Sequence, residues 1–242
     1  MVSVVIPVYN EEAYIGKCLK SLMNQEEQPD EIIVVNNNST DRTEEIVKRY
    51  PVTIVVEKKK GIIPARNKGF NLAKGDIIAR TDGDTIVPPD WIKKIKKSFA
   101  DEKLMALSGP ANYYPLPDAV QMKNWQTIAV LKSFKKVLGH DCLFGPNMAI
   151  RKSIWEKVKN DVCLDDAEVH EDIDLAIHIA PFGKIRFDKN MIVSSSWRRW
   201  KKLESYFEYP YRGVKSVGRH KKMNIKKDGK EFFQKLVTRY FL

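Results

Sequence analysis

This sequence of 242 residues has few cysteines and no long apolar run. Its three cysteines, Cys18, Cys142 and Cys163, lie far apart, without the paired spacing of a disulfide framework or of a structural zinc site, so a reducing compartment is expected. No segment approaches the ~20 consecutive apolar residues of a membrane-spanning helix. Met1 leads into an apolar run of strand length without the basic residues that open a secretory signal peptide, so none is predicted. The hydrophobic fraction of 43% is enough for a packed core, and a folded globular protein is predicted.

Two glycine-rich phosphate motifs are also absent. No Gly-x-Gly-x-x-Gly follows the first apolar run, which disfavours a dinucleotide-binding Rossmann domain, and no Gly-x-x-x-x-Gly-Lys-Ser/Thr occurs. Any phosphates must therefore be neutralised by metal ions and cationic side chains instead of a glycine loop. The four histidines, His140, His170, His178 and His220, show no metal-ligand spacing, and each is expected to be a surface or core residue.

Positive charge is concentrated at one end of the chain. The net charge is +11, but from Arg198 to Leu242 fourteen Lys or Arg face four acids, so this last fifth carries +10 of it. Aromatic residues alternate with the basic ones there: Trp197, Trp200, Tyr206, Phe207, Tyr209 and Tyr211. Three interpretations are open: a solvated helical face, a patch that binds nucleic acid, and an aromatic, cationic segment on an anionic membrane surface.

Apolar runs and amphipathic segments alternate over the first 110 residues. Strands are predicted at 2–8, 31–35, 52–56 and 76–81, and helices at 11–23, 41–50 and 63–73. This alternation predicts an α/β fold with a mostly parallel, Rossmann-like sheet covered by helices on both faces, because each parallel crossover needs a connection of that length. Ligands of such sheets bind at the carboxyl ends of the strands. Polar clusters follow three of the strands, at 7–11, 36–41 and 82–84, so we expect them to converge on one crevice.

The cluster Asp82-Gly83-Asp84 is the strongest indication of chemistry. It separates a buried apolar run from a helix that two prolines, Pro88 and Pro89, introduce. Two carboxylates one residue apart repel each other, whereas Mg²⁺ or Mn²⁺ takes one or two carboxylates and fills its other positions with water and phosphate oxygens. An ordinary Asp-Gly turn is the alternative. The context favours a metal site that also holds a phosphate.

Four ordered motifs resemble the nucleotide-sugar half of the inverting family-two glycosyltransferases, which have the GT-A fold. The matching segments are Val4–Glu11, Ser39–Asp41, Ala65–Gly69, and Thr81–Asp84 with Pro88–Trp91. The resemblance implies a nucleotide diphosphate sugar as donor, with a UDP-sugar expected first and a GDP-sugar as the alternative, and Mn²⁺ or Mg²⁺ as cofactor. It further implies that Asp84 is the direct metal ligand and that Asp82 lies by the ribose or a metal-bound water. Residues 1–110 are expected to form the half that binds the nucleotide sugar. The other residues implied in donor binding are Pro7, Val8, Tyr9, Glu11, Asn36, Asn38, Arg66 and Gly83.

One departure from the family leaves the base of the donor open. Where relatives usually have two aspartates after the second strand, this chain has Asn36-Asn37-Asn38. An amide oxygen can accept a hydrogen bond from uracil N3, but an amide also donates two hydrogen bonds, which a carboxylate cannot.

Residues 111–196 are expected to form the acceptor and catalytic half of the same domain. A strand is predicted at 105–108, a helix at 119–138 with Trp125, Ile128 and Leu131 facing inward, and a helix at 152–158. Between the last two helices, Gly145-Pro146 is a turn that feeds a short strand. The resemblance implies that this loop, with Gly145, lies under the sugar and the acceptor.

A further helix is predicted to begin near Glu171, with acids in its first turn. Acids there gain ~0.3 to 1 kcal/mol from the helix dipole, which is a purely structural explanation. An inverting transfer, however, needs a base on the side of the anomeric carbon opposite the leaving phosphate. The pair Glu171-Asp172 resembles the family's acidic pair at this place, which implies Asp172 as the general base; Asp174 is the less favoured alternative.

The leading hypothesis is a metal-dependent inverting glycosyltransferase that moves a sugar to a hydroxyl of a glycan or lipid-linked acceptor. Its tail, residues 197–242, is expected to be helical and to face the membrane, which predicts a peripheral protein at the cytoplasmic membrane face. In an alternative reaction the acceptor is a polyprenyl phosphate, which needs no base, and Arg198 and Arg199 bind its phosphate. A hypothesis of another class is a non-catalytic basic binding module, but no nucleic-acid motif is recognisable and no nucleic-acid partner is expected.

Overall fold

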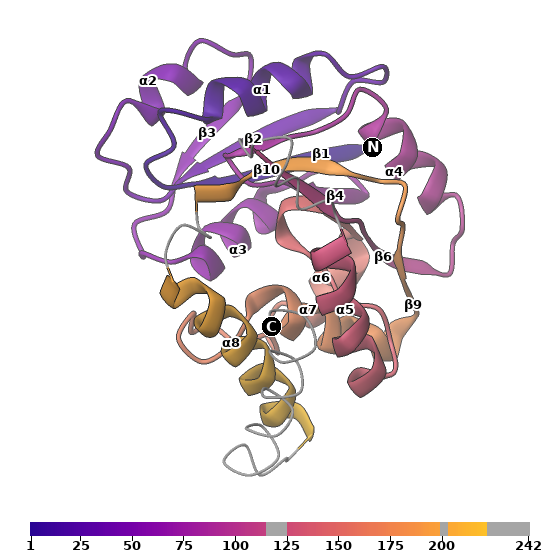
Figure 1. The fold of residues 1–242 in the computed structure, drawn as a ribbon. Helices are drawn as coiled ribbons and strands as arrows, with labels where there is room; N and C mark the ends of the chain where they lie inside the picture. The colour runs from indigo at the N-terminus through magenta and orange to yellow at the C-terminus, as the bar shows by residue number, and fades with distance from the viewer. Residues whose placement is uncertain (115–124, 199–202, 222–242) are drawn as a thin grey trace.

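The computed structural model describes residues 1–114, 125–198 and 203–221 (Figure 1). A seven-stranded sheet forms its centre, in the order β3-β2-β1-β4-β8-β6-β9. The strands are β1 (Val2–Val8), β2 (Glu31–Asn36), β3 (Thr53–Val56), β4 (Ile77–Arg80), β6 (Leu104–Ser108), β8 (Met148–Arg151) and β9 (Lys184–Phe187).

The first four strands form the parallel sheet that the sequence predicts. β1 pairs in parallel with both β2 and β4, and β2 pairs in parallel with β3. Beyond β4 the sheet is mixed, because β8 is antiparallel to β4 and to β6, while β9 is parallel to β6. The parallel strands bring their carboxyl ends to one edge, so Val8, Asn36 and Arg80 end on the same side of the sheet.

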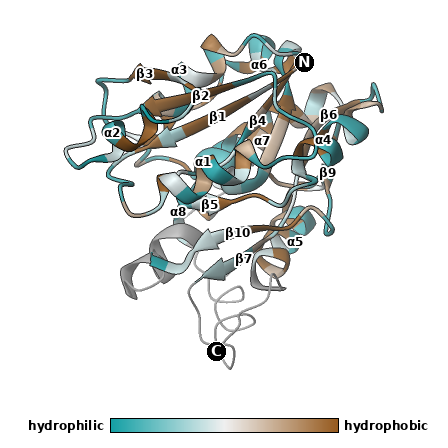
Figure 2. Ribbon diagram, turned by 90° about the horizontal axis from the view of Figure 1, so that it is seen from above, coloured by the Kyte–Doolittle hydropathy of each residue, from teal (hydrophilic) through white to brown (hydrophobic). Residues whose placement is uncertain are grey.

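Helices cover both faces of this sheet (Figures 1 and 2). Alternate residues of β1 are buried on opposite faces, because successive side chains of a strand point to opposite sides. Val4 and Ile6 belong to a core with residues of α1 (Ile15–Met23) and α4 (Trp91–Phe99), next to α2 (Thr43–Val47). Val5 belongs to the other core, with residues of α3 (Ile62–Leu72), α6 (Lys152–Val158) and α7 (Glu171–Ile179).

A smaller layer lies beside the main sheet. Its three strands are β5 (Thr85–Ile86), β10 (Val193–Ser196) and β7 (Ala111–Tyr114), with β10 in the middle, antiparallel to β5 and parallel to β7. Helix α5 (Trp125–Leu138) and helix α8 (Leu203–Lys221) meet α7 in a separate apolar cluster that contains Phe134, Ile173 and Val217. This layer is the smaller subregion that the fold prediction includes, and its role toward an acceptor stays a prediction.

The predicted α/β GT-A architecture agrees with this arrangement, whereas several helix boundaries were wrong. Helix α1 begins at Ile15 and not at residue 11, because the Glu11 N–H donates to Thr43 Oγ1 (2.7 Å) and holds that segment as a loop. Helix α2 is shorter than predicted and begins at Thr43, whose N–H and hydroxyl both donate to Asp41 Oδ1. The predicted start of α5 falls on residues 115–124, outside the described part of the chain.

The C-terminal tail is helical over 203–221, and residues 199–202 and 222–242 lie outside the described ranges. Among the helices that the structure describes, none is both long enough and apolar enough to cross a bilayer. Contact of the tail with a membrane surface stays a prediction.

Gly69 on α3 should tolerate no side chain. A Cβ there would lie 2.3 Å from Val5 Cγ1 and 3.0 Å from Val35 Cγ2, so α3 approaches the sheet more closely than an alanine allows. We expect Gly69→Ala to lower the free energy of unfolding in urea by about 1–3 kcal/mol, although alanine favours helix. The matched control is Gly16→Ala on α1, where the new Cβ would meet its nearest neighbours at 3.7 Å. Gly16→Ala should be neutral or stabilising; an equal loss in both variants would contradict this packing argument.

Candidate active site

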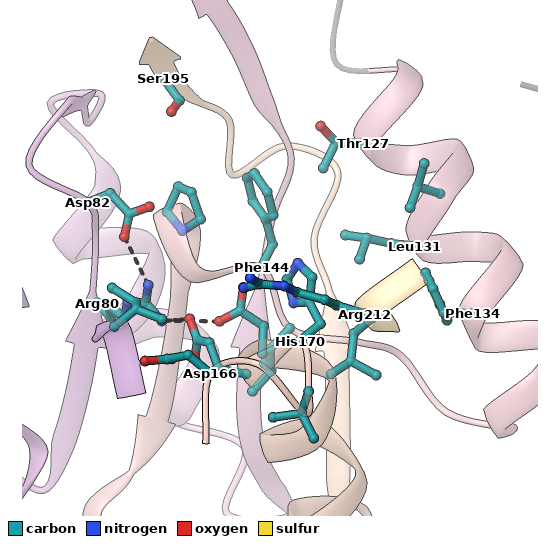
Figure 3. Close-up of a pocket in the computed structure, with 18 of the residues that line it drawn as sticks. Arg80, Asp82, Thr127, Leu131, Phe134, Phe144, Asp166, His170, Ser195 and Arg212 are labelled. Atoms are coloured by element: carbon teal, nitrogen blue, oxygen red, sulfur yellow. Dashed lines mark hydrogen bonds and ion pairs between the residues drawn. The ribbon is translucent and has the colours of Figure 1, made fainter. Parts of the chain in front are cut away.

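A cavity of about 430 Å³ opens where the carboxyl ends of the parallel strands face the smaller layer (Figure 3). Its walls come from the turn after β4, the loop before β8, the segment leading into α7, strand β10 and helices α5 and α8. The acids among its lining residues are Asp82, Asp84, Asp166, Glu171 and Asp172. Segments far apart in the chain therefore bring the predicted metal acids and the predicted base into one space.

Arg80, at the end of β4, binds three carboxylates and is 2% exposed. Its Nη2 donates to Asp82 Oδ1 (3.0 Å), and its Nη1 donates to Asp172 Oδ1 (3.1 Å) and to Glu171. Burial alone lowers the pKa of the Arg80 guanidinium, but the charges of Glu171, Asp82 and Asp172 raise it above its usual value. Arg80 therefore carries a permanent positive charge between the two groups of acids.

Glu171 and Asp172, the first residues of α7, have opposite pKa shifts. Burial raises the pKa of Glu171, but Arg80 and Arg66 outweigh this and lower it, and Arg66 Nη1 donates to its carboxylate at 2.6 Å. The pKa of Asp172 is raised well above its usual range, by burial and by the charge of Glu171. Asp172 Oδ2 accepts a hydrogen bond from the Gly145 N–H (2.7 Å), which fixes its orientation. Adjacent acids whose environments separate their pKa values are typical of acid–base sites.

Asp84, which lines the cavity, and Glu11 both contact the guanidinium of Arg198. Arg198 Nε is 3.2 Å from Asp84 Oδ2, and Arg198 Nη2 donates to Glu11 Oε1. Burial raises the pKa of Glu11 to about 7, against the lowering effect of Arg198. The second carboxylate oxygen of Glu11 is buried without a hydrogen bond. Two acids that share a cation mark a position that suits positive charge.

Comparisons with known proteins identify the family. The profile of glycosyl transferase family 2 matches residues 3–159. The chain belongs to glycosyl transferase family 2. With this membership the predicted enzyme class, a glycosyltransferase, is confirmed.

The relatives of this family 2 transferase align with different shares of its chain. It is 36% identical over 106 residues to the putative glycosyltransferase EpsH of Bacillus subtilis, which is 42% of this chain and 31% of that one. It has the fold of the mannosyltransferase PcManGT of Pyrobaculum calidifontis, solved with GDP-Man and Mn²⁺ (TM-score 0.67, 22% identity, 99% of this chain and 69% of that one). It also has the fold of S. aureus TarS 1-349, solved with UDP-GlcNAc (TM-score 0.66, 18% identity, 99% and 72%). The aligned segment spans only 31% and 18% of the first two curated relatives that match it.

In this transferase the predicted donor-binding residues lie at the ends of β1 and β2. Pro7 and Val8 end β1 and pair with Val35 and Asn36, and the half-exposed Tyr9 has Lys60 Nζ 4.9 Å from its ring centroid. Gly83 packs against this end of the sheet, because a Cβ there would lie 2.9 Å from Val8 Cγ1. Their contact with a donor stays a prediction.

Two further predicted residues have structural partners in the transferase. Arg66 is 1% exposed, and besides Glu171 it donates to Asn67 Oδ1, so it positions the acid pair from behind the cavity. Gly145 leaves no room for a side chain, because a Cβ there would lie 2.7 Å from Arg80 Nη2. Arg198 lies between Glu11 and Asp84, and Arg199 falls outside the described residues.

The asparagines that replace the usual aspartates organise a neighbouring loop. Asn37 Nδ2 donates to the main-chain oxygens of Glu57 and Lys59, and Asn37 Oδ1 accepts from the Gly61 N–H. Asn38 Nδ2 donates to the main-chain oxygens of Glu57 and Lys58. A carboxylate could accept from the Gly61 N–H but could not make the four donated contacts, since it has no proton to donate. The amides therefore hold the 57–61 loop, whose Gly61 lines the cavity.

Three lining residues have no signal in the sequence. Asp166 accepts a hydrogen bond from the Ile63 N–H at the start of α3, 103 residues away along the chain. His170 precedes α7, and Arg212 comes from α8, where it was counted only as one charge of the basic tail. Each reaches the cavity through tertiary packing that no local pattern indicates.

Replacing Arg80 should destabilise the whole transferase. Arg80→Met removes the buried cation that Asp82, Glu171 and Asp172 share and leaves Glu171 paired with Arg66. Removing one partner of a buried ion pair typically costs about 3–5 kcal/mol. The measurement is the free energy of unfolding in urea. Arg42→Met is the matched control, because the pair of Arg42 with Glu12 is solvent-exposed and should contribute about 1 kcal/mol or less. A loss at Arg80 no larger than that of the control would contradict the role of Arg80.

Proposed function

We propose that this chain catalyses the metal-dependent transfer of a sugar, with inversion, from a nucleotide diphosphate sugar to a hydroxyl of a glycan or lipid-linked acceptor. The observation that carries the proposal is that one cavity holds both sets of acids. Asp82 and Asp84, which follow β4, and Asp172, which begins α7 and has a raised pKa, all line it, and Arg80 binds both Asp82 and Asp172. Family membership supports the donor class, as do the GDP-Man complex of PcManGT and the UDP-GlcNAc complex of TarS.

The acids beside β5 fit a hard divalent cation. Asp84 is 6% exposed, and the guanidinium between Asp84 and Glu11 lies where positive charge is favoured. Asp84 would hold Mn²⁺ or Mg²⁺, with Asp82 on a metal-bound water or the ribose, as the oxygen-only donor set requires. A bound ion would neutralise the charge that develops on the leaving diphosphate. Mn²⁺ is present in the PcManGT complex, which supports this assignment.

Asp172 is placed to take the proton of the acceptor. In the transfer, the acceptor oxygen forms its bond to the anomeric carbon, the bond from that carbon to the diphosphate oxygen breaks, and the acceptor proton passes to Asp172. Arg80 and the Gly145 N–H hold the carboxylate in place, and its raised pKa makes it a stronger base than an ordinary aspartate. Glu171 keeps its charge between Arg66 and Arg80 and so holds the pKa of Asp172 up.

The surroundings of Asp172 favour a neutral hydroxyl over a polyprenyl phosphate as acceptor. Glu171 and Asp166 add negative charge beside it, and Arg80 is already bound to three carboxylates. Among the described residues that line the cavity, Arg212 is a cation that would favour the phosphate. Apolar residues of α5, Val130, Leu131 and Phe134, complete the wall and suit the face of a sugar ring or the start of a lipid. Normal turnover by Asp172→Asn would favour the phosphate acceptor instead.

Attachment at the cytoplasmic membrane face is part of the proposal. It is supported by the charge of the tail and by Tyr211 and Arg219, which are exposed on α8.

The donor is identified most directly by melting temperature with UDP-, GDP- and dTDP-sugars plus Mn²⁺, because only the cognate donor should stabilise the fold strongly by mass action. Melting temperatures that no nucleotide sugar changes would contradict the donor class.

Binding and turnover should separate in two variants. Asp84→Asn should lose the Mn²⁺-dependent rise in melting temperature that the donor produces, because the metal carries much of the diphosphate affinity. Asp172→Asn should keep that rise but lose transfer by about 10²–10⁴-fold, the typical contribution of a general base. Asp161→Asn is the matched control at an exposed aspartate and should change neither quantity. Unchanged transfer by Asp172→Asn would remove that residue as base.

The pH dependence of transfer should report the raised pKa of Asp172. A base works only after it loses its proton, so kcat/KM should fall about tenfold per pH unit below that pKa. Because burial and Glu171 raise the pKa, this acid limb should lie well above the titration range of a free aspartate, about pH 4. The measurement is kcat/KM against pH, which reports the pKa values of the free enzyme. A rate that stays constant down to about pH 5 would show that Asp172 is not the group that titrates.

A further inference from the structure

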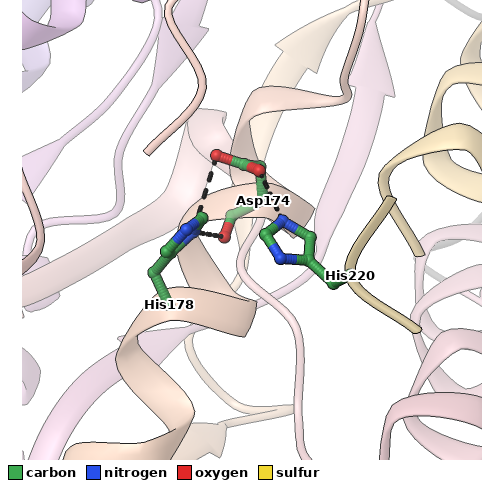
Figure 4. A group of neighbouring side chains, drawn as sticks. All are labelled: Asp174, His178 and His220. Carbon is green, nitrogen blue, oxygen red and sulfur yellow. Dashed lines mark hydrogen bonds and ion pairs between the residues drawn. The ribbon is translucent and has the colours of Figure 1, made fainter. Parts of the chain in front are cut away.

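Two histidines meet at one buried carboxylate, away from the residues that line the cavity. Asp174 lies on α7 and is 1% exposed; His178 follows one helical turn later, and His220 comes from α8 (Figure 4). His220 Nε2 is 2.9 Å from Asp174 Oδ1, and His178 Nδ1 is 3.7 Å from Asp174 Oδ2. One ligand atom from each of the three residues lies within 4.8 Å of the others, and both histidine side chains are about one fifth exposed.

These separations suit a small metal ion. Zinc binds imidazole nitrogen and carboxylate oxygen at about 2.0–2.2 Å, so neighbouring ligand atoms of a tetrahedral site lie about 3.3 Å apart. His220 Nε2 is 2.9 Å from Asp174 Oδ1, close to that value, and a ring nitrogen of His178 lies within 4.8 Å of the ligand atoms of both. Small rotations of two partly exposed rings would bring the three groups to equal distances from one ion.

The partners of these residues support the same conclusion. The Asp174 main-chain oxygen is 2.9 Å from His178 Nδ1, and metal-bound histidines commonly use a carbonyl to orient the ring. The Cys163 N–H donates to Asp174 Oδ2 (2.9 Å), which fixes the carboxylate with Oδ1 directed at His220. The two imidazole rings meet edge to face, with centroids 4.7 Å apart, so they converge on Asp174 from two helices.

We propose that Asp174, His178 and His220 bind Zn²⁺, with a water in the fourth position. Two imidazoles and one carboxylate are a usual zinc set, whereas the oxygen-only acids Asp82 and Asp84 suit Mn²⁺ or Mg²⁺. Zinc would take the lone pair of His220 Nε2 in place of the contact with Asp174 Oδ1, so a proton on Nε2 would move to Nδ1 or to solvent as the ion enters. The site does not depend on the proposed transfer reaction.

The ion would link α8 to α7. Two contacts already hold the part of α8 that precedes His220. Ser216 Oγ accepts from the His170 N–H (2.7 Å), and Gly213 lies so close to Phe134 that a Cβ would be 2.5 Å from its ring. Arg212, two helical turns before His220, lines the cavity. A zinc ion at His220 would therefore hold the helix that closes one side of the cavity, without contacting substrate.

Zinc titration of the metal-free chain tests this proposal. After dialysis against a chelator, we expect one Zn²⁺ per chain by elemental analysis, and a melting temperature raised by roughly 5–10 °C when Zn²⁺ reaches about 100 times its Kd. His220→Gln and His178→Gln should each lose both effects. His140→Gln, at a histidine outside the cluster, is the matched control and should keep them, as should Asp84→Asn, which excludes binding at the cavity.

A second measurement distinguishes loss of the zinc site from misfolding of a variant. With Co²⁺ in place of Zn²⁺, the unsubstituted chain and His140→Gln should show the intense visible absorption of a four-coordinate ion. His178→Gln should not show it, even when its far-ultraviolet circular dichroism is the same as that of the unsubstituted chain and so shows that the variant is folded. Zinc that stabilises His220→Gln and the unsubstituted chain equally would overturn the proposal. So would zinc stoichiometry that is lost in Asp84→Asn.

Discussion

The buried charge of Arg80 is the constraint on which the rest of the active site depends. A guanidinium inside a protein is tolerated only when carboxylates compensate it. Its partners are Asp82, two residues later, and Glu171 and Asp172, which lie 91 and 92 residues further along the chain. Gly145 packs directly on the guanidinium as well. One side chain therefore holds the turn after β4, the loop before β8 and the start of α7 in a single arrangement.

The same charge gives two adjacent acids different properties. Glu171, between Arg66 and Arg80, stays ionised, and its negative charge together with burial raises the pKa of Asp172. A structural role and a proton-accepting role are thus separated on neighbouring residues of one helix. Arg198 holds Glu11 and Asp84 together, so the side proposed for the metal already favours a cation. Because the chain belongs to glycosyl transferase family 2, we interpret the side that favours a cation as the proposed metal site and Asp172 as the proposed base.

The features that depend on local patterns could be predicted from the sequence. Strands β1 to β4 and the helices between them follow from the alternation of apolar and amphipathic segments. Motifs selected Asp82, Asp84 and Asp172 as candidates, and all three line one cavity. Long-range contacts were not predictable. Arg80 read as one polar residue in an apolar run, and the antiparallel β8 is set by packing between β4 and β6. His178 and His220 come from different helices, so their spacing in the sequence carries no signal.

The most direct test of the central claim is a crystal structure with Mn²⁺ and a non-hydrolysable analogue of the cognate nucleotide sugar. The account predicts anomalous scattering from the metal beside Asp84. It also predicts Asp172 on the face of the anomeric carbon opposite the diphosphate, within reach of an acceptor hydroxyl. A metal bound away from Asp84, or Asp172 on the same face as the diphosphate, would contradict it.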